Sequence, residues 1–563
     1  LDGSGARDKG GYSGNRLGAA SKKTGPLPKH PDPTERCHTR LRHWHAVTLL
    51  VSALLLLYAR TGSYGYIDFD DTAYLQDNLM VQRGLTIEGI RWAFTSFYAA
   101  NWHPLTWMSH MADVSLFGMD PGAHHLVNVF LHGVVSLLVY ALTIELLARR
   151  DAALAAALLF LVHPQHVESV AWLAERKDLL CALFYLAAIL AYSRYSRAPS
   201  ALRMTAVMVL YVLALLSKPM AVTLPVILLV LDAWPLARAS NAGNSMALRW
   251  WPLLREKIPF LPVTLGACVV TVAAQSQSGA VAGLAAMQLT DRLINALVSY
   301  GLYLRDFLVP SRLGVFYPLG SINFFTELLP AAAALIGTFG VGLWMRRRHP
   351  GLLAGCMWFL ITLLPVIGLV QVGSQARADR YMYIPSVGLL LGLVSVLPAA
   401  TAHARRIGLT AVALAAGFWG FLCYLQVGYW ESPEALYKRT AEVTRDNVFA
   451  ETRLLDLLIA RGDLASASER ARSLVVRFPG RYEGYMSMGG IALASGNPAE
   501  AERWFRAAEE RAPAHWHVLN DLGIAVLRQA RKTEGCEILE RALSMGGPSA
   551  LLEKNLLAGD CTR

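Results

Sequence analysis

The chain has 563 residues, of which 54% are hydrophobic and 17% are charged, and its mean hydropathy is +0.36. Roughly a quarter of the residues of a soluble protein are charged, so this composition excludes a wholly soluble chain and predicts a polytopic membrane protein. The net charge of +11 lies largely in the N-terminal leader and in short clusters between apolar runs. That distribution is typical of topology signals and does not indicate nucleic-acid binding.

Composition divides the chain into three parts. Residues 1–43 are rich in Gly, Ser, Pro and basic residues without apolar periodicity, which predicts a disordered basic leader. Residues 44–430 hold the apolar runs and form the predicted membrane domain. The first run, Trp44–Tyr58, is interpreted as a signal anchor, which places the aromatic segment 61–123 outside the cytoplasm. Residues 431–563 have the pattern of a soluble domain of amphipathic helices.

The apolar runs set the number of predicted membrane spans. A helix that crosses a bilayer needs about 20 apolar residues, and basic clusters mark the cytoplasmic loops. Together these rules predict about eleven spans, a cytoplasmic N-terminus and a C-terminus outside. The charged run 291–309 is predicted to lie at the outer interface instead of spanning. The runs after the first are 125–147, 152–172, 179–193, 204–216, 220–236, 258–274, 291–309, 328–345, 351–371, 381–400 and 407–428.

Residues 446–548 repeat a pattern with a period of 34 residues. A small residue at a turn, a small residue where paired helices cross and a terminal Pro are typical of tetratricopeptide repeats. We predict three units, at 446–480, 481–513 and 514–548, stacked as an α-solenoid with a concave surface for a polypeptide. The recurring positions are Gly462, Gly496 and Ala530, then Ala467, Ala501 and Gly535, then Pro479 and Pro513. Nearby, Cys536 and Cys561 could pair in an oxidising compartment, although their spacing does not require it.

The segment Tyr66–Tyr74 carries three carboxylates, Asp68, Asp70 and Asp71, just beyond the first apolar run. Acidic residues at such a place could cap a helix that begins near Thr72. They could equally supply a general base, because repulsion between neighbouring carboxylates raises one pKa and leaves a group able to take a proton. Spacing alone leaves both interpretations open.

Two further polar groups lie on segments that the topology places at the outer face. His125, Asn128 and His132 share one helix face, a pattern more often explained by hydrogen bonds between membrane helices. In the motif 163–178, the residues His163, His166 and Glu168 are of types that ligate metals, but the spacing of a zinc motif is absent. In the same motif, Glu168, Trp172 and Glu175 are predicted to share one face of a helix.

Five basic residues oppose the positive-inside trend, because the topology puts them on the outer side. An anionic lipid phosphate would explain such charges. Ion pairs and interfacial anchoring are the alternatives. The residues are Arg176, Lys177, Lys218, Arg377 and Arg380.

These motifs together resemble the transmembrane and tetratricopeptide-repeat protein family, whose members are GT-C-type glycosyltransferases related to protein O-mannosyltransferases. The resemblance covers about residues 60–550, and a composition rich in Ala, Arg and Leu suggests a bacterial member. The motifs that carry it are Phe-Asp70-Asp71-x-x-Tyr, Asn101-Trp-His-Pro-Leu-Thr-Trp, Ser109-His-Met-x-Asp113-x-x-Leu-Phe-Gly, His124-His-Leu-x-Asn128, His163-Pro-x-His-Val-Glu-Ser-Val-Ala-Trp-x-Ala-Glu-Arg-Lys-Asp178, Ser217-Lys-Pro and Gln375-Ala-x-Ala-Asp-Arg-Tyr-x-Tyr-Ile-Pro385.

The resemblance implies an all-α protein: a GT-C-like membrane domain that transfers a sugar from a polyprenyl-phosphate donor to protein Ser or Thr hydroxyls, with inversion. Asp70 or Asp71 would be the general base. The sugar pocket, with a possible divalent cation, is expected at Asp113, His125, His163, His166 and Glu168. The lipid phosphate is expected at Arg176, Lys177, Lys218, Arg380 and Tyr383.

The expected partners are the lipid-linked donor, membrane lipid and an acceptor polypeptide held by the repeats. The expected location is a bacterial inner membrane, with the repeats in the periplasm. The alternative is a catalytically inactive membrane scaffold that recruits partners through its repeats. A transporter of lipid-linked sugars ranks last, because it would need polar residues along the whole path and here they gather at one face.

Overall fold

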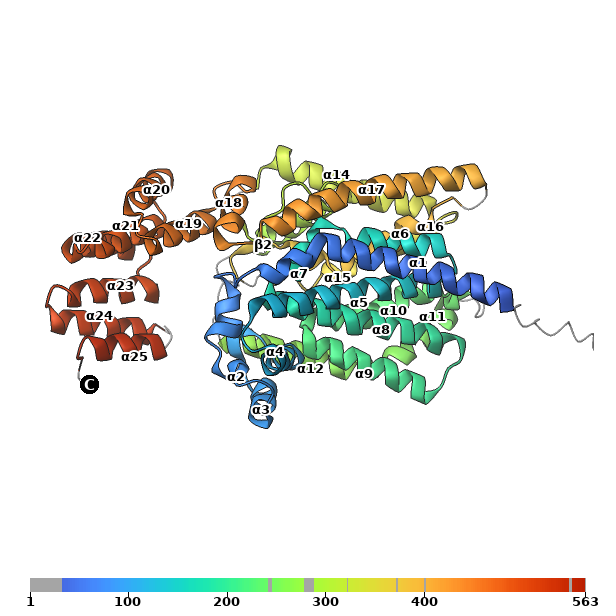
Figure 1. Ribbon diagram of the computed structural model, residues 1–563, viewed down its shortest axis with the longest axis horizontal. Helices are drawn as coiled ribbons and strands as arrows, with labels where there is room; N and C mark the ends of the chain where they lie inside the picture. The colour runs from blue at the N-terminus through green and yellow to red at the C-terminus, as the bar shows by residue number, and fades with distance from the viewer. Residues whose placement is uncertain are drawn as a thin grey trace, which may run out of the picture. The chain divides into compact units, whose positions relative to one another are not determined.

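The computed structural model describes residues 33–240, 246–277, 288–320, 322–370, 373–398, 401–545 and 549–561, which are almost entirely helical (Figure 1). The chain forms two compact units, residues 1–48 and residues 49–563. Most of the predicted leader, residues 1–32, lies outside the described residues. Helix α1 (Pro33–Tyr58) begins within residues 33–43, the described part of the predicted leader, and continues through the first apolar run.

The part that precedes residue 430 consists of helices of very different lengths. Two short strands, β1 (Tyr317–Pro318) and β2 (Gln375–Arg377), pair antiparallel between them. The helices after α1 are α2 (Leu79–Gln82), α3 (Ile87–Thr95), α4 (Pro104–Phe117), α5 (Pro121–Leu147), α6 (Arg150–Leu161), α7 (Val167–Ala171), α8 (Arg176–Arg197), α9 (Ala201–Ser217), α10 (Leu224–Ala233), α11 (Met246–Lys257), α12 (Phe260–Gln277), α13 (Leu289–Leu308), α14 (Leu329–Met345), α15 (Pro350–Leu363), α16 (Pro385–Ser395) and α17 (Ala402–Gly428).

Five of these helical segments are long and apolar enough to cross a membrane, and seven are if each of two bent pairs forms one span. The count of eleven stays a prediction, because several predicted runs form apolar helices of 10–17 residues, including α9, α15 and α16. Helix α13, which the charges place at the interface, is not among the candidates. The candidates are His43–Ser63, Pro121–Leu147, Leu173–Arg197, Phe324–Met345 and Ala402–Gly428, with the bent pairs Arg150–Leu161 + Pro164–Ala171 and Arg249–Lys257 + Phe260–Ser276.

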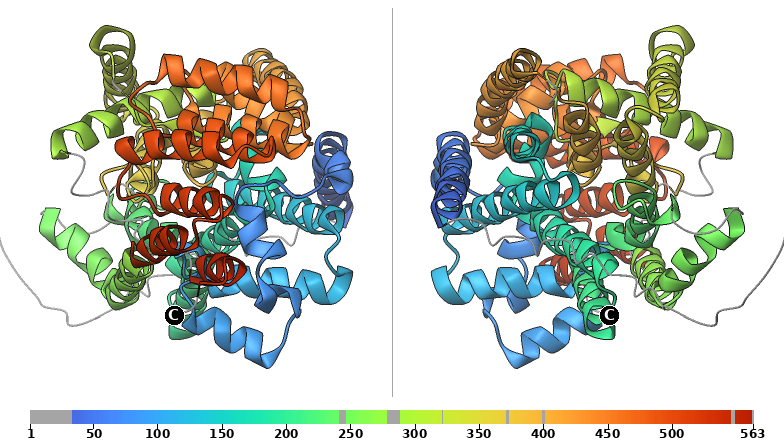
Figure 2. Two further views of the ribbon diagram at one scale, coloured as in Figure 1. Left: turned by 90° about the vertical axis from the view of Figure 1, so that its left-hand side faces the viewer. Right: turned by 90° about the vertical axis from the view of Figure 1, so that its right-hand side faces the viewer.

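The membrane helices pack against one another through small residues and leave large apolar side chains outside. Helix α5 packs against both α6 and α8, and α8 packs against α9 (Figure 1; Figure 2). A Cβ at Gly355 of α15 would lie 2.5 Å from the carbonyl oxygen of Gly388 of α16, a close approach typical of membrane helices. Helices α14 and α17 expose Ile336, Trp344 and Phe421, as lipid-facing helices do.

The segment after α1 folds into short elements instead of a slack loop. It holds a π-helical turn (Thr72–Gln76) and helices α2, α3 and α4. Trp107 of α4 is fully buried and contacts the rings of Tyr74 and His103. This aromatic packing joins the π-helical turn to α4.

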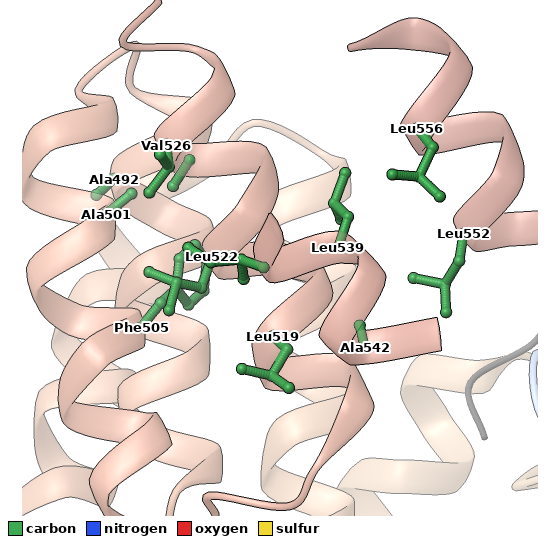
Figure 3. Close-up of a cluster of buried hydrophobic side chains, with 12 residues drawn as sticks. Ala492, Ala501, Phe505, Leu519, Leu522, Val526, Leu539, Ala542, Leu552 and Leu556 are labelled. Carbon is green, nitrogen blue, oxygen red and sulfur yellow. The ribbon is translucent and has the colours of Figure 1, made fainter. Parts of the chain in front are cut away.

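The C-terminal helical region, residues 433–561, is a series of antiparallel helix pairs. The repeating small residues Gly462, Gly496 and Ala530 adopt φ angles of 75°, 74° and 62°, which is the left-handed turn that Gly accommodates most easily. An apolar core joins the helices between residues 492 and 556 (Figure 3), and a separate cluster joins those between residues 455 and 491. The helices are α18 (Pro433–Val443), α19 (Val448–Ala460), α20 (Leu464–Arg477), α21 (Glu483–Ala494), α22 (Pro498–Arg511), α23 (Trp516–Leu527), α24 (Lys532–Ser544) and α25 (Ser549–Ala558).

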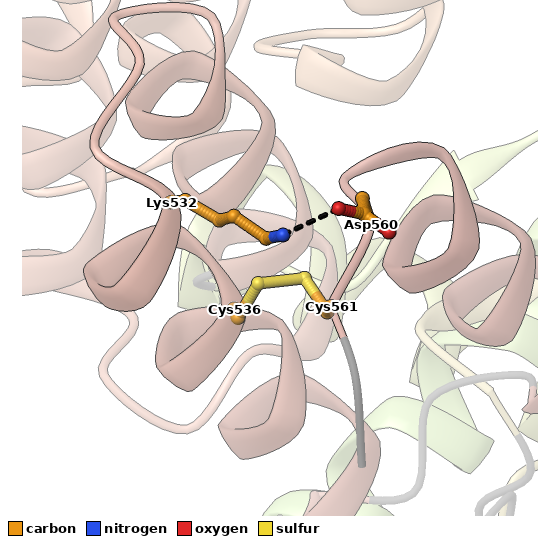
Figure 4. Close-up of a disulfide and its surroundings, with 4 residues drawn as sticks. All are labelled: Lys532, Cys536, Asp560 and Cys561. Carbon is orange, nitrogen blue, oxygen red and sulfur yellow. Dashed lines mark hydrogen bonds and ion pairs between the residues drawn. A yellow bond between two sulfur atoms is a disulfide. The ribbon is translucent and has the colours of Figure 1, made fainter.

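The last helix of this region is tied to its neighbour by a covalent bond. Cys536 of α24 and Cys561 after α25 form a disulfide, beside an ion pair between Lys532 and Asp560 (Figure 4). The cysteine pair that the sequence leaves optional is therefore joined in the fold.

Candidate functional site

Asp70 and Asp71, the neighbouring acidic residues of the segment after α1, have different environments. Asp71 is fully buried, and its two carboxylate oxygens accept the backbone N–H groups of Ile67 (3.0 Å) and Ala174 (2.9 Å). It makes no side-chain cap to the helical turn that follows. Asp70 is half-buried, and among the described residues it makes no hydrogen bond or ion pair. Asp71 therefore anchors the segment, and Asp70 keeps a carboxylate available.

Burial shifts the pKa values of both carboxyls upward. Desolvation raises the pKa of Asp71 to about 7, against the lowering effect of its two backbone hydrogen bonds. Desolvation also raises the pKa of Asp70, and the neighbouring Lys177 and Arg380 partly offset this rise. A carboxylate whose pKa is raised is a stronger base, which is the property that proton abstraction from a hydroxyl needs. Asp68 is exposed, and among the described residues its side chain accepts one hydrogen bond, from Thr72 Oγ1 at 3.4 Å.

A cluster of opposite charges surrounds Glu175, in the 3-10 turn between α7 and α8. Its carboxylate lies 3.0 Å from Lys177 Nζ, 3.4 Å from Lys218 Nζ and 3.2 Å from Arg380 Nε. Lys218 also pairs with Asp178 at 2.6 Å. Three predicted phosphate-binding residues, from α8, the turn after α9 and the segment before α16, thus meet at one carboxylate.

Arg380 joins this cluster to the rest of the motif 163–178. It forms an ion pair with Glu168, which also accepts the Arg380 backbone N–H at 2.9 Å. The guanidinium lies 5.3 Å from the Trp172 ring centroid and 5.2 Å from that of Tyr381. The prediction that Glu168, Trp172 and Glu175 lie on one continuous helix is wrong, because α7 ends at Ala171. Even so, Glu168, Trp172 and Glu175 all contact Arg380.

Arg176 lies apart from this cluster. It is fully buried and forms an ion pair with Asp113, while it donates to Asn128 Oδ1 (2.8 Å) and to the His124 carbonyl (2.8 Å). A guanidinium with these partners and no exposed surface is not available to an outside phosphate. His125 is also buried, and its Nε2 lies 3.2 Å from the Gly65 carbonyl. Asp113 and His125 therefore link the segment after α1 to α8 and α5, and they do not contact the Glu175 cluster.

A separate polar cluster contains His163, His166 and Tyr383. His166 bonds Ser386 at 2.9 Å, His132 bonds the Tyr383 hydroxyl at 2.7 Å, and His163 bonds the Phe307 carbonyl at 3.0 Å. All three predicted residues are buried among aromatic rings. Their hydrogen bonds run to neutral groups, which is the arrangement expected of contacts between membrane helices.

One group of side chains has the geometry of a metal site. The ligand atoms of His110, Asp113 and His124 all lie within 4.8 Å of one another, and all three residues are buried. Among the described residues neither nitrogen of His110 has a hydrogen-bond partner. However, Arg176 already neutralises Asp113, so a cation would be buried beside a guanidinium with no uncompensated anion to bind it. For this reason we assign no ion to the group.

Sequence reasoning missed three members of the site. The spacing predicts only that Glu175 lies on a helix face. It does not indicate that Glu175 is the shared partner of Lys177, Lys218 and Arg380. No sequence pattern points to Tyr74, yet its hydroxyl accepts a hydrogen bond from Lys177 Nζ at 3.2 Å. Asp178, the partner of Lys218, could have been found from its place at the end of the same motif.

The fold and this site define a multi-pass membrane protein with a cluster of buried ion pairs next to the acidic segment after α1. Comparison with known proteins makes the class more specific. The chain is homologous to the TMTC protein O-mannosyl-transferases. It is 24% identical to TMTC1 of Homo sapiens over an alignment of 506 positions, gaps included, which covers 79% of this chain and 57% of that protein. It is 42% identical to Tmtc1 of Drosophila melanogaster over 125 residues, which are 22% of this chain and 14% of that protein.

A third relative matches over a smaller share of the chain than human TMTC1 does. TMTC3 of Mus musculus is 26% identical over an alignment of 392 positions, gaps included, which covers 61% of this chain and 41% of that protein. The chain thus matches from about a seventh to just over half of the length of these relatives. No family model matches.

Among solved structures, an Archaeoglobus fulgidus oligosaccharyltransferase has a TM-score of 0.41 and 17% identity, covering 73% of this chain and 59% of its own. ArnT from Cupriavidus metallidurans, bound to undecaprenyl phosphate, has a TM-score of 0.38 and 15% identity, covering 88% of this chain and 79% of its own. No conclusion rests on likenesses at this level.

Proposed function

We propose that the protein is a GT-C-type glycosyltransferase of the membrane that moves a sugar, mannose by the names of its relatives, from a polyprenyl-phosphate donor to Ser or Thr hydroxyls of a polypeptide. The observation that carries this proposal is the half-buried, unpartnered Asp70 carboxylate beside the cations around Glu175. A membrane scaffold has no need for such an arrangement. Homology to protein O-mannosyl-transferases supports the same reaction.

In this mechanism Asp70 is the base and Asp71 positions it. Asp70 takes the proton of the acceptor hydroxyl while the hydroxyl oxygen attacks the anomeric carbon. The bond between that carbon and the phosphate oxygen of the donor breaks, and the electron pair leaves with the lipid phosphate. Because attack and departure occur on opposite sides, the configuration at the anomeric carbon inverts.

The growing negative charge on the phosphate is stabilised by cations near Asp70. Arg380 is the best placed, because it lies close enough to Asp70 to offset the rise of that carboxyl's pKa and also borders the half-buried Tyr381 ring, at 5.2 Å from its centroid; Lys218 lies 5.7 Å from the same centroid. Lys177 lies deeper and is held by Glu175, Tyr74 and the Ala174 carbonyl. Arg176 is left out of this group because its burial and its pairing with Asp113 remove it from contact with a ligand.

We further propose that residues 446–548 form tetratricopeptide repeats on the outer side of a bacterial inner membrane, where they hold the acceptor polypeptide. The 34-residue spacing of the left-handed turns supports the repeat type. The disulfide between Cys536 and Cys561 supports an oxidising compartment for this region.

The test compares two single substitutions in purified protein supplied with polyprenyl-phosphate mannose and acceptor peptides. Asp70→Asn should lower transfer by about 10²-fold or more, with donor binding and stability unchanged, because its side chain has no structural partner. Asp71→Asn should lower transfer and stability together. Full activity in both variants would refute the mechanism, and the absence of donor-dependent thermal stabilisation in the wild type would favour the scaffold.

A further inference from the structure

The loop that carries Asp70 is held by aromatic rings from distant parts of the chain. The ring of Phe69, the residue before Asp70, stacks on Trp172 with a centroid distance of 5.1 Å and an interplanar angle of 8°. The same ring lies 5.2 Å from that of Phe449, the second residue of α19. Phe449 stacks in turn on Phe316, at 4.4 Å. The single ring of Phe69 therefore contacts both the membrane part and the C-terminal helical region.

Hydrogen bonds connect the same pieces. The hydroxyl of Tyr437 in α18 donates to the backbone carbonyl of Asp68 at 2.5 Å, and Tyr437 is buried. Asn447, the cap of α19, donates through Nδ2 to the Phe316 carbonyl at 3.0 Å. The Val315 backbone N–H donates to Thr440 Oγ1 at 3.2 Å. The corner between α18 and α19 is thus fastened both to the Asp70 loop and to the segment 315–316.

Asp70 itself contributes nothing to its own placement. It has no hydrogen bond or ion pair among the described residues, so its neighbours decide where its carboxylate lies. On one side Asp71 is bonded to the N–H groups of Ile67 and Ala174. On the other side Asp68 and Phe69 are held by Tyr437 and Phe449. Without Tyr437 and Phe449, the residues before Asp70 keep the stacking of Phe69 on Trp172 but lose both contacts to the C-terminal helical region.

We propose that Tyr437 and Phe449 are positioning residues for Asp70, so that the C-terminal helical region completes the active site and does not merely recruit the acceptor. This inference rests on the proposed function. A general base must lie within hydrogen-bond reach of the hydroxyl that it deprotonates, and a displacement of about 1 Å can lower the rate by about 10²-fold. The two residues therefore act on the rate of transfer through the loop, without contact with the substrates.

The experiment uses the full chain in detergent or nanodiscs, with Phe449→Ala, Phe449→Trp and Tyr437→Phe. Tyr482→Phe is the matched control, because it removes a hydroxyl that bonds His515 within the helical region, away from the loop. Hydrogen–deuterium exchange of residues 66–76 is measured together with kcat and KM for polyprenyl-phosphate mannose and a short Ser/Thr peptide. A short peptide minimises any contribution of acceptor recruitment by the repeats.

In Phe449→Ala and Tyr437→Phe, exchange of the loop should rise by roughly fivefold or more, which is the factor that one aromatic pair or hydrogen bond supplies. The value of kcat should fall by about tenfold or more with KM for the donor unchanged, and Phe449→Trp should restore both. Tyr482→Phe should match the wild type in both readouts. Loop exchange that stays at the wild-type rate in both test variants overturns the inference. So does faster exchange with kcat retained, or a fall in kcat that Tyr482→Phe shares. If the wild type itself transfers no sugar, the proposed function fails, and loop exchange still decides whether these residues hold the loop.

Discussion

The shared carboxylate of Glu175 allows a quantitative prediction about stability. Its side chain is 2% exposed and lies within 3.4 Å of Lys177, Lys218 and Arg380. At an effective dielectric constant of about 20, each of these attractions is worth about 5 kcal/mol before the cost of desolvation is subtracted. The cost of desolvation cancels most of the summed attraction. The net effect is therefore taken from other buried ion pairs, where removal of one partner lowers the free energy of unfolding by about 3–5 kcal/mol.

The substitution Glu175→Gln keeps the shape of the side chain and removes its charge. Lys218 keeps Asp178 and Arg380 keeps Glu168. Lys177 loses the carboxylate of its one ion pair among the described residues, while its 9% exposed side chain keeps only Tyr74 and the Ala174 carbonyl as hydrogen-bond partners, so most of the loss comes from this ammonium. We expect a decrease of about 3 kcal/mol in the free energy of unfolding, at the lower end of the range for buried pairs.

A double-mutant cycle in detergent, followed by chemical and thermal unfolding, measures the effect. Glu175→Gln with Lys177→Met should lie within about 1 kcal/mol of the wild type, because the stranded charge is gone. Glu145→Gln is the matched control: its partner Arg197 is 60% exposed, so the loss should stay below about 1 kcal/mol. A double variant no more stable than Glu175→Gln alone would refute the reasoning.

Three further predictions concern proton binding, packing and the disulfide. Because burial raises the pKa of Asp71 from 3.8 to about 7, the folded state binds this proton more tightly than the unfolded chain. The contribution of Asp71 to the free energy of unfolding should therefore be greatest below pH 4 and fall as the pH rises toward 7, so the difference in stability between the wild type and Asp71→Asn should shift against the wild type over that range; a shift in its favour would contradict this sign. Gly489→Ala should destabilise the helical region by about 1–3 kcal/mol, because its Cβ would lie 2.3 Å from Phe505 Cε1, whereas Gly490→Ala, with a nearest contact at 4.0 Å, should unfold like the wild type. Cys536→Ser should lose about 2–4 kcal/mol under oxidising conditions and become insensitive to reductant in thermal unfolding, unlike the wild type.

The sequence determined those features that depend on composition and local period. Low charge and long apolar runs indicated a membrane protein, because a bilayer requires them of any spanning helix. The 34-residue period located left-handed turns at Gly462, Gly496 and Ala530, since each helix pair must reverse at the same point. The motifs around Asp70 and Glu168 also pointed to the residues that gather in the fold.

Only the tertiary structure decided which residues share a site. Arg176 and Lys177 are neighbours in sequence and both oppose the topology rule, yet one pairs with Asp113 and the other with Glu175. The difference between Asp70 and Asp71 arises because the N–H of Ala174, more than a hundred residues away, reaches one carboxylate and not the other. Buried charges are stable only beside opposite charges, and those partners come from whichever helices pack nearby. Local periodicity carries no information about that choice, because it depends on how the helices meet in space.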